Sequence, residues 1–177
     1  GKIAVVTQPM TRTQDGSGYG AVNAQRTSGA LEAAKRGAVG YLVRSLSTDD
    51  TRLPHTGGAA PAGIPAAALS TVDAELLDRM AARGKPVKVR LEMASSFNPK
   101  AQAWNISGEI VGREKPDEVL VIGGHLDSWD VGTGASDDGV GCIITWEAIR
   151  LMSRLGIRPR RTVRLVLFTN EENGLRG

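Results

Sequence analysis

Short apolar runs, bounded by glycine, proline and polar residues, recur along the chain and predict buried strands. Another strand is predicted at 87–93, where apolar and charged residues alternate with the period of two typical of a strand with one solvated face. Helical patterns separate several of these strands, which indicates an α/β fold. The strands predicted from apolar runs are 3–7, 39–43, 64–69, 104–111, 119–123 and 162–168.

Apolar residues three or four positions apart predict helices over 72–83 and 140–155, and a shorter helix that begins after Ser28. Ser28 and Thr71 are the predicted N-cap residues. The glycine-bearing segments 11–20 and 49–63 are predicted to be loops. Glycines are predicted to end the helices, at Gly37 or Gly40, at Gly84 and at Gly156.

A polar segment, 94–102, divides the chain into two predicted domains, 1–93 and 103–177. The first has no cluster of histidine, cysteine and carboxylate residues, so we expect no catalysis there. A strand-like segment begins directly after Gly1, and the chain stops at Gly177 where an element should begin. Both ends therefore suggest an internal fragment of a larger protein.

The composition is that of an ordinary globular protein, with 41% hydrophobic and 23% charged residues among 177. The net charge of +3 comes from scattered arginines, and aromatic residues make up only 4%, so we expect no nucleic-acid partner. No apolar run approaches the ~20 residues of a membrane span, so we expect no membrane partner. The single cysteine, Cys142, is predicted to pack in the core.

Candidate chemistry gathers where two predicted strands end. His125 and Asp127 follow the strand 119–123, and Glu171 and Glu172 follow the strand 162–168. Asp137 lies in the turn before the helix 140–155. The carboxyl ends of strands in an open α/β sheet meet at the edge where ligands bind, so these side chains are expected to converge.

Four of these five residues also have a structural interpretation. A lone histidine is often structural. Asp137 or its neighbour Asp138 could be the N-cap of the following helix. Glu171 and Glu172 could simply favour the positive end of a helix that starts near Gly174.

The convergent set favours a metal site with two cations. Asp127 is placed to hydrogen-bond the imidazole of His125. A carboxylate such as Asp137 can bridge two ions, and of the paired glutamates one can bind metal while the other acts as a general base. A dinucleotide site is disfavoured, because the glycine-rich turn 132–137 lacks a third glycine and its carboxylates would repel a pyrophosphate.

Several motifs resemble, in order and spacing, the co-catalytic zinc aminopeptidase family and more closely its carboxypeptidase Q branch. Motifs before residue 94 look like the protease-associated domain of that branch, and the resemblance covers nearly the whole chain. The motifs in the second part are 124–132, Gly134, Ala135, 137–139, 164–167, Glu171 and Glu172, and those in the first are 1–3, Gln8, Pro9, Gly29, Ala30, 32–35 and 54–57.

The resemblance implies a fold and a domain order. Residues 1–93 would form a β-rich α+β protease-associated domain, incomplete at its start. Residues 94–102 would form a linker. Residues 103–177 would be the first part of a three-layer α/β/α zinc exopeptidase domain, truncated in this chain.

The resemblance also implies two zinc ions as cofactors and a role for each site residue. His125 would bind one zinc ion, Glu172 would bind the other, and Asp137 would bridge the two ions. Glu171 would be the general base, and Asp127 would support His125. The family completes its site with a further aspartate and a further histidine from later segments, so this chain holds three of five ligands and is expected to be inactive alone.

The implied function is a zinc-dependent exopeptidase that hydrolyses dipeptides or short peptides. The resemblance further implies a secreted or periplasmic location and a homodimer for the full-length protein. Two alternatives stay open from the residues: a non-catalytic fragment that serves only as a protease-associated interaction module, and a two-metal deacylase of amino-acid derivatives.

Overall fold

The computed structural model describes residues 1–55, 57–96, 98, 100–130 and 132–177. It divides into two compact units, Gly1–Phe97 and Asn98–Gly177, and the division falls inside the predicted linker 94–102. Four residues of the motifs and linker named above lie outside the described residues: Thr56, Phe97, Pro99 and Val131.

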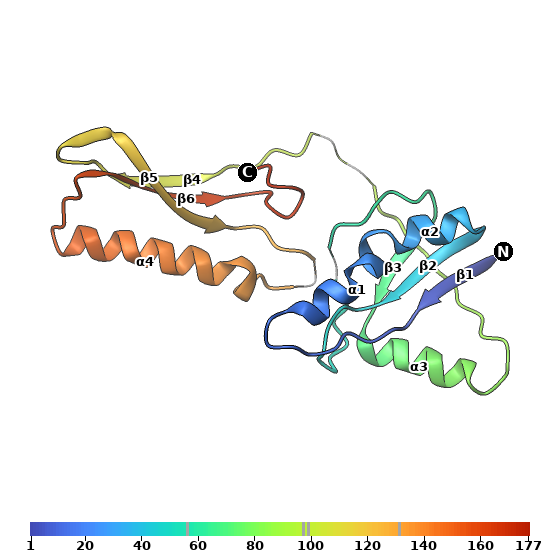
Figure 1. Cartoon of the computed structure of the whole chain (residues 1–177). Coiled ribbons are helices and arrows are strands. Elements are labelled where there is room, and N and C mark those ends of the chain that lie inside the picture. Colours follow the sequence, from blue (N-terminus) through green and yellow to red (C-terminus); the bar gives the residue numbers. More distant parts are fainter. Residues whose placement is uncertain (56, 97, 99, 131) are drawn as a thin grey trace. The chain divides into compact units, whose positions relative to one another are not determined.

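The first unit contains a parallel sheet in the order β1-β2-β3 (Figure 1). Its strands are β1 (Lys2–Val6), β2 (Ala38–Arg44) and β3 (Ala66–Leu69), and each overlaps a strand predicted from an apolar run. Parallel neighbours need a crossover connection, which α1 (Ser17–Thr27) and α2 (Gly29–Lys35) provide between β1 and β2.

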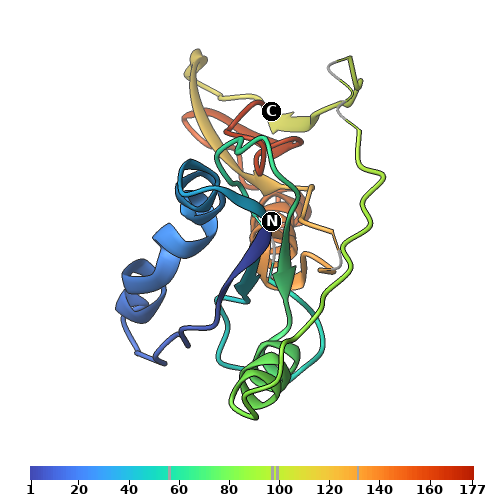
Figure 2. The same ribbon diagram turned by 90° about the vertical axis from the view of Figure 1, so that its right-hand side faces the viewer.

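Helices cover both faces of this sheet. Figures 1 and 2 show α1 and α2 on one side and α3 (Thr71–Ala81) on the other. The alternation of side chains along β2 explains the two layers. Tyr41 and Val43 pack with Val22 and Ala30 in the core beneath α1 and α2. Arg44 points to the opposite face, where it donates a hydrogen bond to Glu75 Oε1 of α3 at 2.9 Å.

The helix α1 was not predicted, and the loop expected over 11–20 is wrong for its last four residues. Among the residues of α1 only Gly18 and Val22 are buried, so the helix leaves almost no apolar periodicity in the sequence. Ser28 is the N-cap residue of α2 as predicted. Gly37, with φ 82°, follows the helix in the left-handed conformation that glycine tolerates.

Two further predictions in the first unit are wrong. The N-cap of α3 is Ser70 rather than Thr71, because Ser70 Oγ accepts a hydrogen bond from Asp73 N at 3.2 Å. The segment 87–93 forms no strand, although its alternating pattern is regular. A strand needs a hydrogen-bonding partner, and the pattern of one segment carries no information about whether a free sheet edge is available.

The second unit contains the sheet order β4-β6-β5. β4 (Ile106–Ile110) pairs antiparallel with β6 (Arg161–Phe168), and β5 (Lys115–His125) pairs parallel with β6 on its other side. The strands predicted at 104–111 and 119–123, although consecutive in the sequence, are therefore not neighbours in the sheet. The central position of β6 explains why its Val163 and Leu165 are only 7% and 6% exposed.

A crossover connects the parallel strands β5 and β6. It consists of a loop, a turn at Ala135–Gly139, and α4 (Val140–Arg154), which lies along one face of the sheet in Figure 1. Gly156 follows α4 with φ 66°, as predicted for its end. The crossover places the turn Ala135–Gly139 next to the carboxyl end of β5.

Among the described residues, none of the helices has both the length and the apolar character needed to cross a bilayer.

We predict that Ser70→Ala destabilises the first unit by about 1 kcal/mol, because the Asp73 amide at the start of α3 loses its side-chain acceptor. Denaturant unfolding of the chain would measure this. Ser153→Ala, on an exposed position of α4, is the matched control and should leave the free energy of unfolding unchanged. Equal effects of the two substitutions would contradict the capping role of Ser70.

Candidate metal centre

The parallel pairing of β5 with β6 brings their carboxyl ends together. His125 lies opposite Phe168 in the register, and Leu126 N donates a hydrogen bond to Phe168 O at 2.7 Å. Residues that follow either strand therefore emerge at one edge of the sheet. Asp127 follows the first strand, and Glu171 follows the second.

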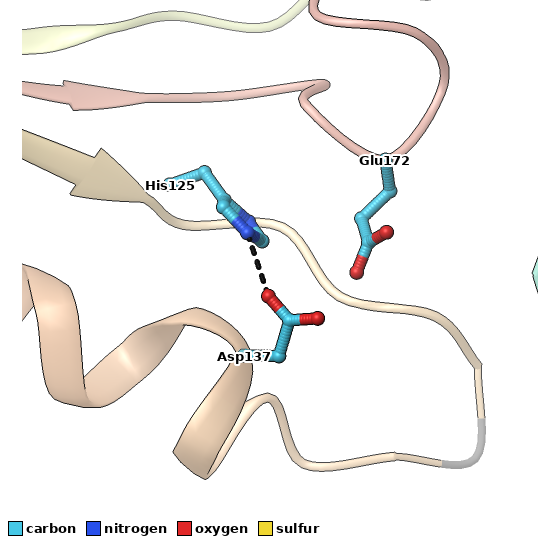
Figure 3. A group of neighbouring side chains, drawn as sticks. All are labelled: His125, Asp137 and Glu172. Atoms are coloured by element: carbon cyan, nitrogen blue, oxygen red, sulfur yellow. Dashed lines mark hydrogen bonds and ion pairs between the residues drawn. The ribbon is translucent and has the colours of Figure 1, made fainter. Parts of the chain in front are cut away.

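Three of the predicted site residues come close together at this edge. His125, Asp137 and Glu172 each offer one ligand atom, and these atoms all lie within 4.8 Å of one another. Figure 3 shows the three side chains converging from β5, from the turn before α4 and from the loop after β6. An imidazole nitrogen with two carboxylate oxygens is a donor set that suits zinc.

The imidazole of His125 is held from both sides. Its Nδ1 lies 2.8 Å from the backbone carbonyl oxygen of Asp127. A carbonyl oxygen can only accept, so Nδ1 carries a proton in this contact. The other nitrogen, Nε2, faces Asp137 Oδ1 at 3.0 Å. This is the orientation in which a metal-binding histidine presents Nε2 to an ion while its other nitrogen bonds to a backbone carbonyl.

The carboxylate of Asp127 does not form the predicted hydrogen bond with the imidazole of His125. It lies 3.6 Å from His125 Nδ1, too far for a hydrogen bond. Its two oxygens instead accept hydrogen bonds from the amides of Glu171 at 3.0 Å and Glu172 at 3.1 Å. Burial acts to raise the pKa of Asp127, but these two amide hydrogen bonds outweigh it and lower the pKa. Asp127 thus supports His125 through its backbone and fixes the glutamate loop through its side chain.

Asp138 makes a contact that the sequence did not reveal. Its Oδ2 accepts a hydrogen bond from His125 N at 3.2 Å, which connects the turn before α4 to the end of β5. A side chain on Gly124 would place Cβ 2.5 Å from this oxygen, so the contact requires glycine there. The N-cap residue of α4 is Gly139, with no side-chain cap, so the helix-cap interpretation of Asp137 or Asp138 is wrong.

The cluster concentrates negative charge. Burial acts to lower the pKa of His125, but hydrogen bonds to the Asp127 carbonyl and to Asp137, together with the charge of Glu171, raise it. Burial is also the first cause of the raised pKa of Glu172, and the charges of Asp137 and Glu171 add to it. A bound cation would relieve this mutual repulsion, which is a physical reason for these groups to share one place.

A hollow of about 350 Å³ adjoins the cluster, with His125, Asp138 and Glu171 on its polar side and Phe168 and Leu175 on its apolar side. Glu171 Oε2 lies 3.7 Å from His125 Nε2. Sequence reasoning also missed Trp129, whose side chain acts to lower the pKa of Glu172 and so opposes the rise caused by burial. Cys142 is buried as predicted, and its thiol donates to the His125 carbonyl oxygen at 3.0 Å.

Residues 105–177 match the model of a protein family described as peptidase family M28. This matched segment, the M28 segment, contains all five residues predicted for the site. His125 ends β5, Asp127 and Asp137 lie between β5 and β6, and Glu171 and Glu172 follow β6. The family assignment therefore agrees with the resemblance drawn from the motifs.

The whole chain is also similar to named peptidases. It is 46% identical to carboxypeptidase Q of Xenopus laevis and 44% identical to that of Homo sapiens, in each case over 98% of this chain. It is 31% identical over 86% of its length to leucine aminopeptidase 2 of Trichophyton equinum, of which it covers 29%. The crystal structure of a peptidase M28 precursor from Shewanella amazonensis superimposes with a TM-score of 0.86, at 43% identity over 98% of this chain.

The chain spans 37% of the Xenopus protein, 36% of the human protein and 40% of the Shewanella chain. The similarity begins well before the M28 segment, so the first unit has a counterpart in these relatives. The interpretation of 1–93 as a protease-associated domain stays a prediction.

We predict that Asp127→Asn loosens the loop that carries Glu171 and Glu172. Asparagine retains one acceptor oxygen but presents an NH₂ group to the second amide, so one of the two hydrogen bonds is lost. Hydrogen exchange of the Glu171 and Glu172 amides should accelerate by about tenfold, the equivalent of roughly 1.4 kcal/mol. Asp117→Asn, at an exposed position of β5, is the control. Unchanged protection in Asp127→Asn would show that this carboxylate does not hold the loop.

Proposed function

We propose that the protein to which these 177 residues belong is a zinc-dependent exopeptidase that hydrolyses dipeptides or short peptides. The observation that carries the proposal is the convergence of His125, Asp137 and Glu172 within the M28 segment. Relatives named carboxypeptidase Q and leucine aminopeptidase 2 support an exopeptidase. The absence of a membrane-crossing helix among the described residues is compatible with the secreted or periplasmic location that we propose.

Two zinc ions would be held by the three converging side chains together with ligands from outside this chain. His125 would bind one ion through Nε2, and Glu172 would bind the other. The side chain of Asp137 is 80% exposed, so its carboxylate has an open face beyond the oxygen that contacts His125. This makes Asp137 the best candidate for the bridging ligand.

Bound zinc would supply Lewis-acid polarisation of the scissile carbonyl and lower the pKa of a water molecule. Glu171 would take the proton from the attacking water and transfer it to the leaving amine. Its carboxylate borders the hollow and lies on the same side of the site as His125 Nε2. Asp127 positions Glu171 because it accepts the hydrogen bond from the Glu171 amide.

We predict that Glu171→Gln in the full-length enzyme lowers kcat by about 10²–10⁴-fold, because glutamine keeps the shape but cannot accept the proton. Zinc content should stay unchanged, since Glu171 is not a proposed ligand. Peptidase assays with metal analysis would measure both. Glu114→Gln, at a surface position remote from the site, is the control. A variant that retains wild-type turnover would remove Glu171 from the mechanism.

Zinc binding by the 177-residue chain tests the proposed ligands. The chain has only two histidines, and they form a matched pair of variants. His125→Ala should weaken zinc binding by at least about tenfold, whereas His55→Ala should not affect it. Isothermal titration calorimetry would measure both affinities. Tight stoichiometric binding of two ions by this chain would contradict a site that needs further ligands from elsewhere.

A substrate panel separates the proposed peptidase from a two-metal deacylase. The full-length protein should hydrolyse free dipeptides faster than N-acyl amino acids, as measured by kcat/KM for each class. The reverse preference would favour the deacylase.

A further inference from the structure

A second hollow lies in the first unit, on the side of the sheet that faces α1 and α2. Its volume is about 350 Å³, within the usual range of ~300–1,000 Å³ for small-molecule pockets. Its wall is apolar and built mostly of small side chains, and its polar groups among the described residues are Arg26, His55 and the hydroxyl of Tyr41, which donates to Gln25 O. The apolar part of the wall includes Ala30, Val43, Ala66, Ala68 and the ring of Tyr41.

The guanidinium of Arg26 carries a positive charge without an anionic partner in the described part of the chain. It donates hydrogen bonds to Gly58 O at 2.7 Å, to Tyr19 Oη at 2.8 Å and to Asn23 Oδ1 at 3.2 Å, and all three acceptors are uncharged. Its Nε is buried and has no hydrogen-bond partner among the residues that the structure describes. The hydrogen bonds given for the guanidinium therefore leave its charge without a compensating anion in the described part of the chain.

His55 is not a second cation in this hollow. Because Arg26 already donates to Tyr19 Oη, the phenol proton is available for the 3.3 Å contact with His55 Nε2. Burial and the positive charge of Arg26 lower the pKa of His55, so the ring is neutral at neutral pH. The polar end of the hollow therefore presents one fixed charge, that of Arg26.

The backbone allows the guanidinium to occupy this position. A Cβ at Gly57 would collide with the Arg26 guanidinium in its present position, so the glycine lets the loop lie directly against the cation. The hydrogen bond from Arg26 to Gly58 O holds the same loop. The cation is thus fixed before any ligand arrives, which reduces the entropic cost of binding.

We propose that this hollow binds a small aliphatic monocarboxylate, with its carboxylate on Arg26 and its hydrocarbon chain against the alanine wall. Arginine binds carboxylates by charge-assisted hydrogen bonds, and the apolar wall favours an alkyl group over a second charge. No acidic side chain is among the described residues of the lining, so the ammonium of a free amino acid would have no partner. Two sources share this chemistry: a free short-chain acid and the C-terminal residue of a peptide.

The alanines suggest a direct way to close the hollow. Ala66 and Ala68 lie on β3 and contact the core beneath α1 and α2. A larger β-branched residue at Ala68 would occupy part of the space while suiting a strand. We therefore expect Ala68→Val to leave the fold stable and to weaken ligand binding.

Calorimetry on the 177-residue chain without added metal tests the proposal with isovalerate and N-acetylvaline. At least one should bind saturably, and isovaleramide, which has the same shape without the charge, should not bind. Tighter binding of N-acetylvaline identifies a peptide C-terminus as the ligand, whereas tighter binding of isovalerate identifies a free acid.

Variants then locate the bound molecule. Ala68→Val should weaken binding by about tenfold or more with no loss in Tm, and Arg26→Gln should abolish it. Arg36→Gln is the control, because Arg36 pairs with Glu32 on an exposed surface. The proposal is overturned if neither carboxylate binds, if isovaleramide binds equally well, or if Ala68→Val binds as tightly as the unchanged chain.

Discussion

The parallel pairing of β5 with β6 is the constraint on which the candidate metal centre depends. It places the ends of both strands at one edge of the sheet, so that His125 emerges beside the loop that carries Glu171 and Glu172. Asp127 strengthens this arrangement, because its carboxylate binds both glutamate amides. An antiparallel pairing would separate these residues by the length of a strand. The crossover through α4 then brings Asp137 to the same edge.

Electrostatics explains why the candidate site would suit a cation. Asp137, Glu171 and Glu172 surround a single imidazole, and burial with mutual repulsion raises the pKa of Glu172. Hydrogen bonds to backbone amides hold the segments that carry these carboxylates at one edge of the sheet. One example is the hydrogen bond from His125 N to Asp138 Oδ2. Hydrogen bonds of this kind position the ligands without neutralising them, which leaves their charge available to a metal.

The apolar runs predicted most strands because a buried strand needs a hydrophobic sequence wherever it pairs. The same runs could not predict that β6 lies between β4 and β5, since order in a sheet depends on the crossover and not on composition. The helix α1 was missed because it buries only Gly18 and Val22. Most of the site residues could be predicted because they follow directly after predicted strands. The contact of Asp138 with His125 depends on a turn conformation that no sequence pattern encodes.

Anomalous diffraction at the zinc edge, from crystals of the full-length protein, tests the central claim most directly. The account predicts two zinc peaks about 3.5–4 Å apart, one beside His125 Nε2 and one beside Glu172, with Asp137 between them. Zinc bound elsewhere in the protein, with His125 and Asp137 still in their hydrogen bond, would contradict it.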